Sequence, residues 1–344
     1  MSKPVPQRLS RSLPARRSKR FLLPSALAVA GVLAGAAAAH ADKTVTHFVL
    51  ANGMQVVVVP DRRVPIVTHM VWYKVGAADE PEGQSGAAHF LEHMMFRGSE
   101  KFPDGYIKRY VMVNGGVQNA HTTADMTWYY QRLPKQKLSA LMELEADRMI
   151  NLRMREEEVR AERGAVMEEL RGNENNLSYL LGVRIRAALY PGHPYGRPVI
   201  GFEPEIGKLT QAHMLAFYRR FYGPDNAILV VAGDVTEGEV RTLAEQTYGR
   251  VPARSNPAPR PTYKLPDRPQ ESRVVFTHER ATAPGIARIF PMPAIDAVPR
   301  TDAVALDVLA HIAGGNLTGR LYRRLVIQDR LATGVSAAYS QSVY

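Results

Sequence analysis

The sequence contains no cysteine among its 344 residues, which excludes disulfide bridges, thiol nucleophiles and thiolate metal ligands. Any metal ion must therefore be held by histidine and carboxylate side chains. Glycine (26) and proline (24) are not enriched, so the chain is neither collagen-like nor of low complexity. With 45% hydrophobic and 22% charged residues, its composition is that of one large globular domain or two ordinary ones.

Acidic residues are absent from positions 1–41, whereas seven lysines and arginines precede residue 21. Without these seven residues the formal net charge falls from +11 to +4. The basic excess therefore belongs to the N-terminal segment, and neither nucleic acid nor another anionic polymer is indicated as a partner.

The basic segment is followed by an apolar run at 21–39 and by the small-residue sequence Ala-His-Ala at 39–41. This order is typical of a secretory signal peptide, and we predict cleavage after Ala41. The alternative is a retained membrane anchor, but Pro24 and many alanines make the run a poor membrane span. We expect no stable membrane insertion after cleavage, and export without cysteines favours a periplasmic or secreted bacterial protein.

The hydrophobic pattern of the remaining chain predicts grouped strands with helices between them. An Asn52-Gly53 turn separates two short strands, of which the second covers 56–59. Further strands are expected at 66–75, 116–122, 126–133 and 227–232, and helices near 86–97, 104–113, 135–151, 156–172, 175–190, 211–222 and 237–248. This grouping predicts the α+β class, with an antiparallel or mixed sheet and not a parallel doubly wound one.

Six prolines between residues 251 and 270 indicate an extended linker. Beyond it, the pattern predicts strands at 273–278, 285–291 and 333–340 and helices at 301–313 and 318–328. This order resembles the start of a second copy of the first domain. We therefore expect four parts: a signal peptide (1–41), a first domain (42–250), a linker (251–270) and an incomplete second domain (271–344).

The sequence His89-Phe90-Leu91-Glu92-His93 has the spacing of a metal-binding helix. In an α-helix the two histidines lie about 40° apart, and Glu92 lies about 60° to the other side of His89. The three polar side chains therefore share one face, opposite the apolar one. This arrangement disfavours the alternative of two hydrogen-bonded core histidines. Two imidazoles at this spacing can bind one zinc ion, but a catalytic zinc site usually has three protein ligands.

The helix predicted at 156–172 carries candidates for the third ligand. On a helical wheel centred on Val166, Glu162 lies at about −40° and Glu169 at about −60°, whereas Glu168 lies at about 200°. Glu162 and Glu169 therefore border the apolar face, and Glu168 points away from it. The alternative is that both carboxylates reach solvent or pair with nearby arginines.

The H-x-x-E-H sequence, followed downstream by E-R-x-x-x-x-x-E (162–169), resembles the inverted-motif zinc metallopeptidases of the pitrilysin, insulin-degrading enzyme and mitochondrial processing peptidase family. Other motifs of the resemblance follow in order: L-x-N-G-M-x-V (50–56), G-A-A-H-F-L-E-H-M-M-F-R-G (86–98), G-G-V-Q-N-A-x-T (115–122), E-L-E-A-D-R-M (143–149), H-P-Y-G (193–196) and the segment 221–235.

The resemblance implies one Zn²⁺ per chain, bound by His89, His93 and Glu169. It also implies that Glu92 activates the water and later passes its proton to the leaving amine. Glu162 would support catalysis by holding a histidine or adjusting the charge of the site. The dipeptide Asn119-Ala120 would lie on a sheet edge that pairs with an extended peptide substrate.

The fold that the resemblance implies has two homologous α+β domains, each with a mostly antiparallel sheet flanked by helices. The first (42–250) would be the zinc-binding peptidase domain, and the second would bind no metal, in keeping with the lack of a second H-x-x-E-H sequence. Val326 and Thr333 occupy positions where family peptidases commonly carry a substrate-binding arginine and tyrosine.

We therefore predict a zinc-dependent endopeptidase that hydrolyses peptides or unfolded protein segments. The alternative is a non-catalytic subunit that retains the fold and holds peptides for a related peptidase. Peptide substrates are the expected partners, and a homologous subunit could complete a homodimer or heterodimer.

Overall fold

The computed structural model describes residues 44–254, 271–292 and 298–340. The predicted signal peptide, its cleavage site and most of the predicted linker lie outside these residues. The chain divides into two units, 1–43 and 44–344, and only the second contains described residues. Among the described residues, no helix combines the length and the apolarity that a membrane crossing requires.

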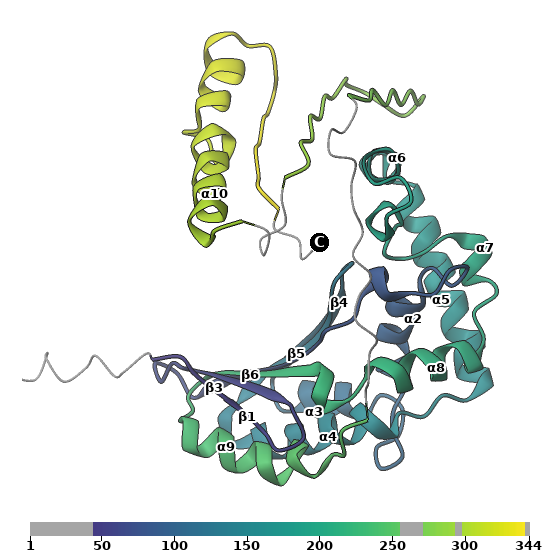
Figure 1. Cartoon of the computed structure of the whole chain (residues 1–344), viewed down its shortest axis with the longest axis vertical. Coiled ribbons are helices and arrows are strands. Elements are labelled where there is room, and N and C mark those ends of the chain that lie inside the picture. Colours follow the sequence, from purple (N-terminus) through teal and green to yellow (C-terminus); the bar gives the residue numbers. More distant parts are fainter. Residues whose placement is uncertain (1–43, 255–270, 293–297, 341–344) are drawn as a thin grey trace, which may run out of the picture. The chain divides into compact units, whose positions relative to one another are not determined.

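The first part of the described chain contains one six-stranded sheet, with the strand order β1-β2-β6-β3-β5-β4 (Figure 1). The parallel pair is β2 with β6, and the other neighbouring strands are antiparallel. The predicted α+β class with a mostly antiparallel sheet is therefore confirmed. The strands are β1 (Thr46–Val49), β2 (Gln55–Pro60), β3 (Ile66–Tyr73), β4 (Val117–Thr122), β5 (Thr127–Pro134) and β6 (Ala227–Gly233).

The predicted hairpin at Asn52-Gly53 joins β1 to β2, with Phe48 opposite Val56. Gly53 adopts a positive φ of 89°, a conformation that glycine reaches without strain. The side-chain amide of Asn52 donates hydrogen bonds of 2.8 Å to the carbonyls of Tyr248 and Val251. The turn is thus fixed to residues 248 and 251 as well as by its own backbone.

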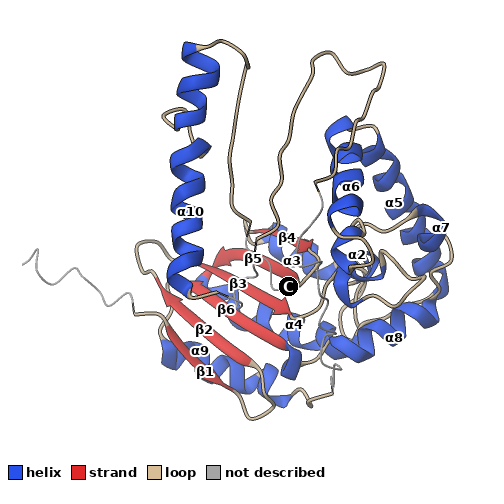
Figure 2. Ribbon diagram, turned by 45° about the horizontal axis from the view of Figure 1, so that its top comes forward, coloured by secondary structure: helices blue, strands red, loops and turns tan. Residues whose placement is uncertain are grey.

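Helices cover one face of the sheet and extend beyond its β4 edge (Figure 2). α3, α4 and α9 lie against the sheet, and α2 packs against β4, α5 and α8. The helices agree with the predicted ones to within a few residues, except that the four-residue α7 was not predicted. They are α2 (Ala87–Met94), α3 (Tyr106–Val113), α4 (Leu138–Asn151), α5 (Glu156–Glu174), α6 (Leu177–Leu189), α7 (Glu203–Ile206), α8 (Gln211–Phe221) and α9 (Glu237–Gln246).

Along β3, buried and half-buried side chains alternate, and this alternation shows which face of the sheet covers the core. Val67, Val71 and Tyr73 are buried beneath the helices, whereas Met70 and Trp72 on the opposite face are only half-buried. Trp72 stacks on Trp128 of β5 with ring centroids 4.4 Å apart. The apolar core therefore fills the space between the sheet and its helices, and the other sheet face carries aromatic side chains.

A chain of polar side chains crosses this core. The two ring nitrogens of His69 contact the Tyr248 hydroxyl and the side-chain oxygen of Gln131, each at 2.9 Å. Gln131 in turn donates to Glu145, and Arg148 donates its Nε–H to the other oxygen of Glu145, both at 2.8 Å. All five side chains are almost fully buried. Burial lowers the pKa of His69 to about 4, so this histidine is neutral at physiological pH.

Arg148 connects this polar chain to α2. Its Nη1 donates to the carbonyl of Met95, directly after the helix, at 3.2 Å. Its guanidinium also lies 4.5 Å from the ring centroid of Tyr129, a cation–π contact. We define the buried polar cluster as His69, Gln131, Glu145, Arg148 and Tyr248.

The second part of the described chain departs from the predicted pattern. The predicted helices are present as α10 (Arg300–Gly314) and as a π-helical segment, η8 (Tyr322–Gln328), which contains Val326. The strands predicted at 273–278, 285–291 and 333–340 are wrong, because these residues form no strand. An extended segment becomes a strand only when a neighbour pairs with its backbone groups, and the described part of the chain supplies none here.

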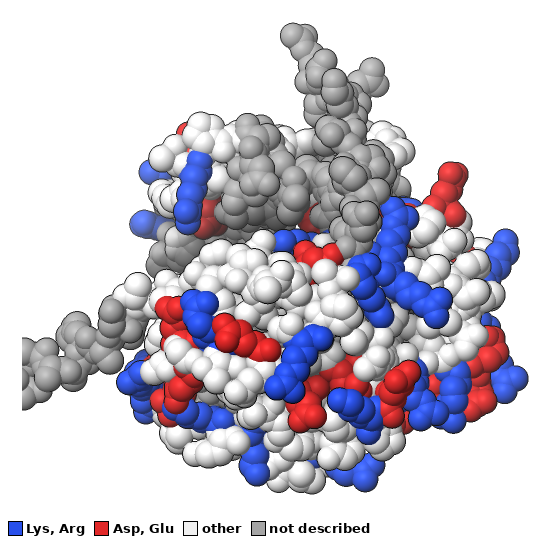
Figure 3. Space-filling view, turned by 60° about the horizontal axis from the view of Figure 1, so that its bottom comes forward, with Lys and Arg blue, Asp and Glu red and all other residues white. Residues whose placement is uncertain are grey.

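Charged side chains of both signs are interspersed on the face of the molecule in Figure 3. A nucleic-acid surface would instead gather lysine and arginine into one patch or stripe. Lysine and arginine are mixed with aspartate and glutamate on the face shown.

Candidate metal centre

The short helix α2 is preceded by Gly86, its N-cap residue, which has a positive φ of 89°. A side chain at this position would approach the carbonyl oxygen of Ile200 to 2.5 Å, so both conformation and space require glycine. The carboxylate of Glu80 accepts a 2.9 Å hydrogen bond from the Ala88 N–H in the first turn. Such a cap satisfies an otherwise unpaired donor and fixes where the helix starts.

The two histidines of α2 lie one turn apart, and their ring centroids are 4.7 Å from each other. Phe90 and Leu91 of the same helix are fully buried. Packing of this apolar side therefore fixes the rotation of the helix about its axis, and His89 and His93 share the face toward α5.

Helix α5 presents its carboxylates as the helical wheel predicts. Val159 and Val166 are fully buried along one side of the helix. Glu162 and Glu169 border that side and face α2, whereas the side chain of Glu168 is 71% exposed and pairs with an arginine of its own helix. Glu169 is itself 44% exposed, so it lines an open site and not the core.

The three predicted zinc ligands place their donor atoms close to one another. Glu169 Oε1 lies 3.7 Å from His89 Nε2, and Glu169 Oε2 lies 3.3 Å from His93 Nε2. Each residue offers one ligand atom such that all three atoms are within 4.8 Å of one another. In a tetrahedral zinc site with bonds of about 2.0–2.2 Å, two donor atoms are roughly 3.3–3.6 Å apart. Two imidazoles and one carboxylate fit zinc in donor chemistry, and the two histidine–carboxylate separations of 3.3 and 3.7 Å lie close to this range.

The orientation of the His93 ring is fixed by a hydrogen bond on the side of the ring that faces away from Glu169. Its Nδ1 lies 2.8 Å from Glu162 Oε1, so Nε2 is the nitrogen that faces Glu169. Glu162 is held in turn by Arg97, whose Nε donates to Oε2 at 2.7 Å. His89 has no such support, because its Nδ1 is buried without a hydrogen-bond partner among the described residues.

The two histidines of the site differ in charge, because their pKa values are shifted in opposite directions. Burial and the neighbouring His93 lower the pKa of His89 to about 4, which keeps this imidazole neutral. Burial opposes a charge on His93 as well, but hydrogen bonds to Glu162 and Glu169 raise its pKa to about 9. The hydrogen bond from His93 lowers the pKa of Glu169. A cation at this position would meet an ionised carboxylate and would take the place of the His93 proton.

Glu92 lies beside the cluster without joining it. It is only 9% exposed, and burial raises the pKa of its carboxyl group. Its Oε2 accepts a 2.5 Å hydrogen bond from the Thr122 hydroxyl on β4. One carboxylate is therefore held close to the two histidines but is left outside the set of three donors.

The predicted substrate-binding dipeptide lies on β4, which is the outermost strand of the sheet. Asn119 is exposed and Ala120 is buried. The Ala120 N–H donates to Asn119 Oδ1 at 3.0 Å. Within the described part of the chain no strand pairs with the outer edge of β4, and a peptide that used this N–H would compete with the Asn119 side chain.

Sequence reasoning did not identify Thr122 or Arg97 as parts of the site. The contact between Thr122 and Glu92 joins a strand to a helix, and no short-range pattern predicts it. Arg97 follows His93 by four residues, and the helical repeat could have drawn attention to it. Its partner Glu162, however, comes from a different helix.

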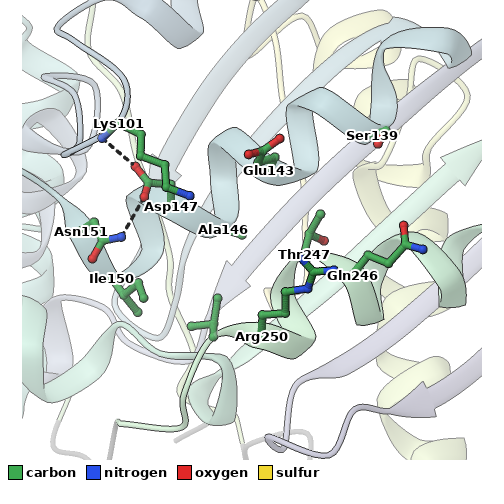
Figure 4. A pocket seen from close by; sticks show the side chains of 11 residues that line it. Lys101, Ser139, Glu143, Ala146, Asp147, Ile150, Asn151, Gln246, Thr247 and Arg250 are labelled. Atoms are coloured by element: carbon green, nitrogen blue, oxygen red, sulfur yellow. Dashed lines mark hydrogen bonds between the residues drawn. The ribbon is translucent and has the colours of Figure 1, made fainter.

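A pocket of about 390 Å³ lies elsewhere in the molecule, between α4 and the end of α9 (Figure 4). Lys101, Glu143, Asp147 and Arg250 contribute charges of both signs to its wall. Asp147 already accepts hydrogen bonds from the Asn151 side chain at 2.7 Å and from the Lys101 backbone at 3.4 Å. None of the predicted site residues lines this pocket, so the candidate site is the cluster on α2 and α5.

Comparison with known families agrees with this geometry. Residues 55–203 match the profile of insulinase (peptidase family M16), and residues 208–343 match that of the peptidase M16 inactive domain. The chain belongs to the M16 peptidase family. The resemblance inferred from the motifs is thereby confirmed at the level of the family.

M16 relatives include the zinc protease PqqE of Helicobacter pylori, which is 33% identical over 297 residues, 86% of this chain and 66% of the relative. The crystal structure of a protease from Helicobacter pylori superposes with a TM-score of 0.74 at 29% identity, covering 87% of this chain and 72% of that one. The periplasmic protease PqqL from Escherichia coli has a TM-score of 0.60 at 27% identity, over 64% of this chain and 26% of that one. The chain spans 60–66% of the length of the first curated relatives it matches.

Proposed function

We propose that this chain is a zinc-dependent endopeptidase that hydrolyses peptides or unfolded protein segments. One observation carries the proposal: donor atoms of His89, His93 and Glu169 converge within 4.8 Å, and a further carboxylate, that of Glu92, is held beside them. Membership of the M16 family and the zinc protease PqqE among its relatives support it.

His89, His93 and Glu169 would hold one zinc ion per chain. When bound, the ion would act as a Lewis acid that makes water nucleophilic near neutral pH and polarises the scissile carbonyl. The protein prepares this site in two ways. Glu162 orients His93 by accepting from its Nδ1, and burial keeps His89 neutral, as a ligand nitrogen must be.

Glu92 would serve as the general base and then as the acid that protonates the leaving amine. Burial raises the pKa of this carboxyl group above its ordinary value. A carboxyl group with a raised pKa holds a proton more readily and can pass it on to the leaving amine. The Thr122 hydroxyl holds one of its oxygens at 2.5 Å, which leaves the other available for a proton.

The open edge of β4 would bind the substrate as an additional strand. Main-chain hydrogen bonds to this edge are independent of side-chain identity, so substrates of varied sequence can bind. Asn119 and Ala120 lie three and two residues before Thr122, which contacts Glu92. A peptide on this strand would therefore pass beside the proposed base.

The first domain (42–250) would carry the catalytic site, and the second (271–344), after the linker at 251–270, would bind no metal. Export with cleavage after Ala41 would place the protein in the periplasm or outside the cell. The related PqqL is described as periplasmic, which supports this location. A homologous subunit would be a partner in addition to peptide substrates.

The experiment is cleavage of a random peptide library by the purified chain, with and without a zinc chelator, together with metal analysis. We expect one zinc ion per chain and cleavage that stops on chelation and returns with added zinc. A metal-loaded protein without cleavage, whose Glu92→Gln variant also functions normally in vivo, would instead support the non-catalytic subunit.

A further inference from the structure

Arg97 lies in the turn directly after α2, between the two helices that supply the candidate ligands. The following Gly98 has a positive φ of 114°, and a side chain there would approach the Asp104 backbone nitrogen to 2.7 Å. The turn is thus held tightly against the loop that precedes α3. From this position the Arg97 guanidinium reaches Glu162 on α5 and Asp104 in the loop.

The hydrogen bonds of Glu162 are divided between its two oxygens. Oε2 accepts both from Arg97 Nε, at 2.7 Å, and from Arg97 Nη2. Oε1 is left for His93 Nδ1, at 2.8 Å. The third guanidinium nitrogen, Nη1, lies 3.4 Å from Asp104 Oδ2, so Arg97 is itself anchored. A lysine in this place could not make two directed bonds to one oxygen, because its ammonium group is a point charge without a planar fork.

We propose that Arg97 is a positioning residue of the metal centre. By fixing Glu162 Oε2 it presents Oε1 to His93, and His93 Nε2 is thereby directed at Glu169. The proposal rests on the proposed function where it concerns zinc. The chain of contacts from Arg97 to His93 exists without the ion.

The start of α5 provides a second arginine–glutamate pair that serves as a matched control. Arg155 binds Glu158 at the start of α5, with Nη2 and Nε at 2.6 and 2.9 Å from Glu158 Oε1. The side chains of Glu158 and Glu162 are equally exposed, at 9%. Among the described residues, neither Arg155 nor Glu158 forms a hydrogen bond or ion pair with either histidine, so loss of Arg155 removes an arginine–glutamate pair without changing the site.

The experiment measures zinc affinity by competition with a chelator for the full chain and three variants. Loss of a group that orients a ligand typically weakens metal binding by about 10- to 100-fold. We expect Arg97→Met to raise the zinc Kd by about tenfold and Arg97→Lys by about threefold. Arg155→Met should stay within about twofold of the wild type. Thermal unfolding without metal verifies that each variant is folded. If Arg97→Met does not fold, the zinc Kd of Arg97→Lys tests the proposal.

A second readout needs no zinc. Crystal structures of the metal-free wild type and Arg97→Met should show the His93–Glu162 contact in the first and its loss in the second. Unchanged zinc affinity in Arg97→Met, an equal loss in Arg155→Met, or an intact His93–Glu162 contact without Arg97 would each overturn the inference. A wild type that binds no zinc would overturn the proposed function, whereas the metal-free structures would still test whether Arg97 positions Glu162.

Discussion

Two clusters of this protein are built from the same kinds of side chain, yet only one has donor atoms to spare. The buried polar cluster contains a histidine, a glutamate and an arginine, and both nitrogens of His69 and both oxygens of Glu145 are bonded within the protein. The cluster on α2 and α5 also combines histidine, glutamate and arginine. There, however, His89, His93 and Glu169 keep donor atoms directed at a shared point.

The difference lies in exposure and in unused bonding capacity, not in residue type. Arg148 and Glu145 are at most 1% exposed, whereas Arg97 and Glu169 are 31% and 44% exposed. A buried cluster whose histidine and glutamate are fully bonded stabilises a particular packing of α4 against the sheet and α2. A cluster with spare donors at the surface can bind a ligand. Substitutions in the first should therefore change stability, and those in the second should change metal binding or turnover.

The largest effect is expected for Glu92→Gln. The amide cannot accept the proton of the nucleophilic water, and loss of a general base typically lowers rates by about 10²- to 10⁴-fold. We expect kcat to fall by about a thousandfold while zinc content and thermal stability stay unchanged. Peptide cleavage and metal analysis on the same samples check this. Equal turnover by the variant would remove Glu92 from the mechanism.

Arg148→Met should produce the largest change in stability. It leaves Glu145 buried without its cationic partner, and breaking a buried ion pair from one side typically costs about 3–5 kcal/mol. Arg97→Met should cost less than about 1 kcal/mol, because its pair is partly exposed and screened by solvent. Urea unfolding of the two metal-free variants measures the contrast, and similar losses in both would contradict it.

Glu169→Gln should lower zinc affinity by about a hundredfold, because an ionised ligand is replaced by a neutral one. Glu168→Gln is its matched control on the same helix, since that side chain is 71% exposed and pairs with Arg171, away from the candidate site. Chelator competition should show Glu168→Gln within about twofold of the wild type. Equal losses would show that the helix face was assigned incorrectly.

The smallest expected effect is on the pH dependence of the unfolding free energy, through His69 of the buried polar cluster. The pKa of His69 is lowered to about 4 in the folded protein, from an ordinary value near 6.5. Between these values the unfolded chain binds the proton more tightly, so stability is present above about pH 6.5 and is lost as pH falls toward 4. From pH 7 to 5.5 this amounts to about 1 kcal/mol. His69→Gln should reduce the pH dependence of the unfolding free energy by that amount, and an unchanged slope would argue against a neutral buried His69.

The sequence predicted those features of the site that depend on helical periodicity. His89 and His93 share a face because they are one turn apart, and Glu169 was separated from Glu168 by the same reasoning. The strands within residues 44–254 were predicted from the hydrophobic pattern and from the Asn52-Gly53 turn. Each of these predictions uses only neighbours along the chain.

The features that sequence reasoning missed depend on contacts between distant segments. Arg148 belongs to a helix rich in charged residues, and its full burial follows from stacking on Tyr129 and pairing with Glu145. Thr122 meets Glu92 only because β4 lies beside α2. The strands expected at 273–278 and 333–340 were wrong for a related reason, since a suitable local pattern does not supply a pairing partner.

Anomalous diffraction at the zinc absorption edge, on crystals of the full chain grown with zinc, would show whether His89, His93 and Glu169 bind one ion together. We expect one strong peak per chain, about 2.0–2.2 Å from His89 Nε2, His93 Nε2 and a carboxylate oxygen of Glu169, with Glu92 outside bonding distance. No peak at this position, or a peak bound by Glu92 in place of Glu169, would contradict it.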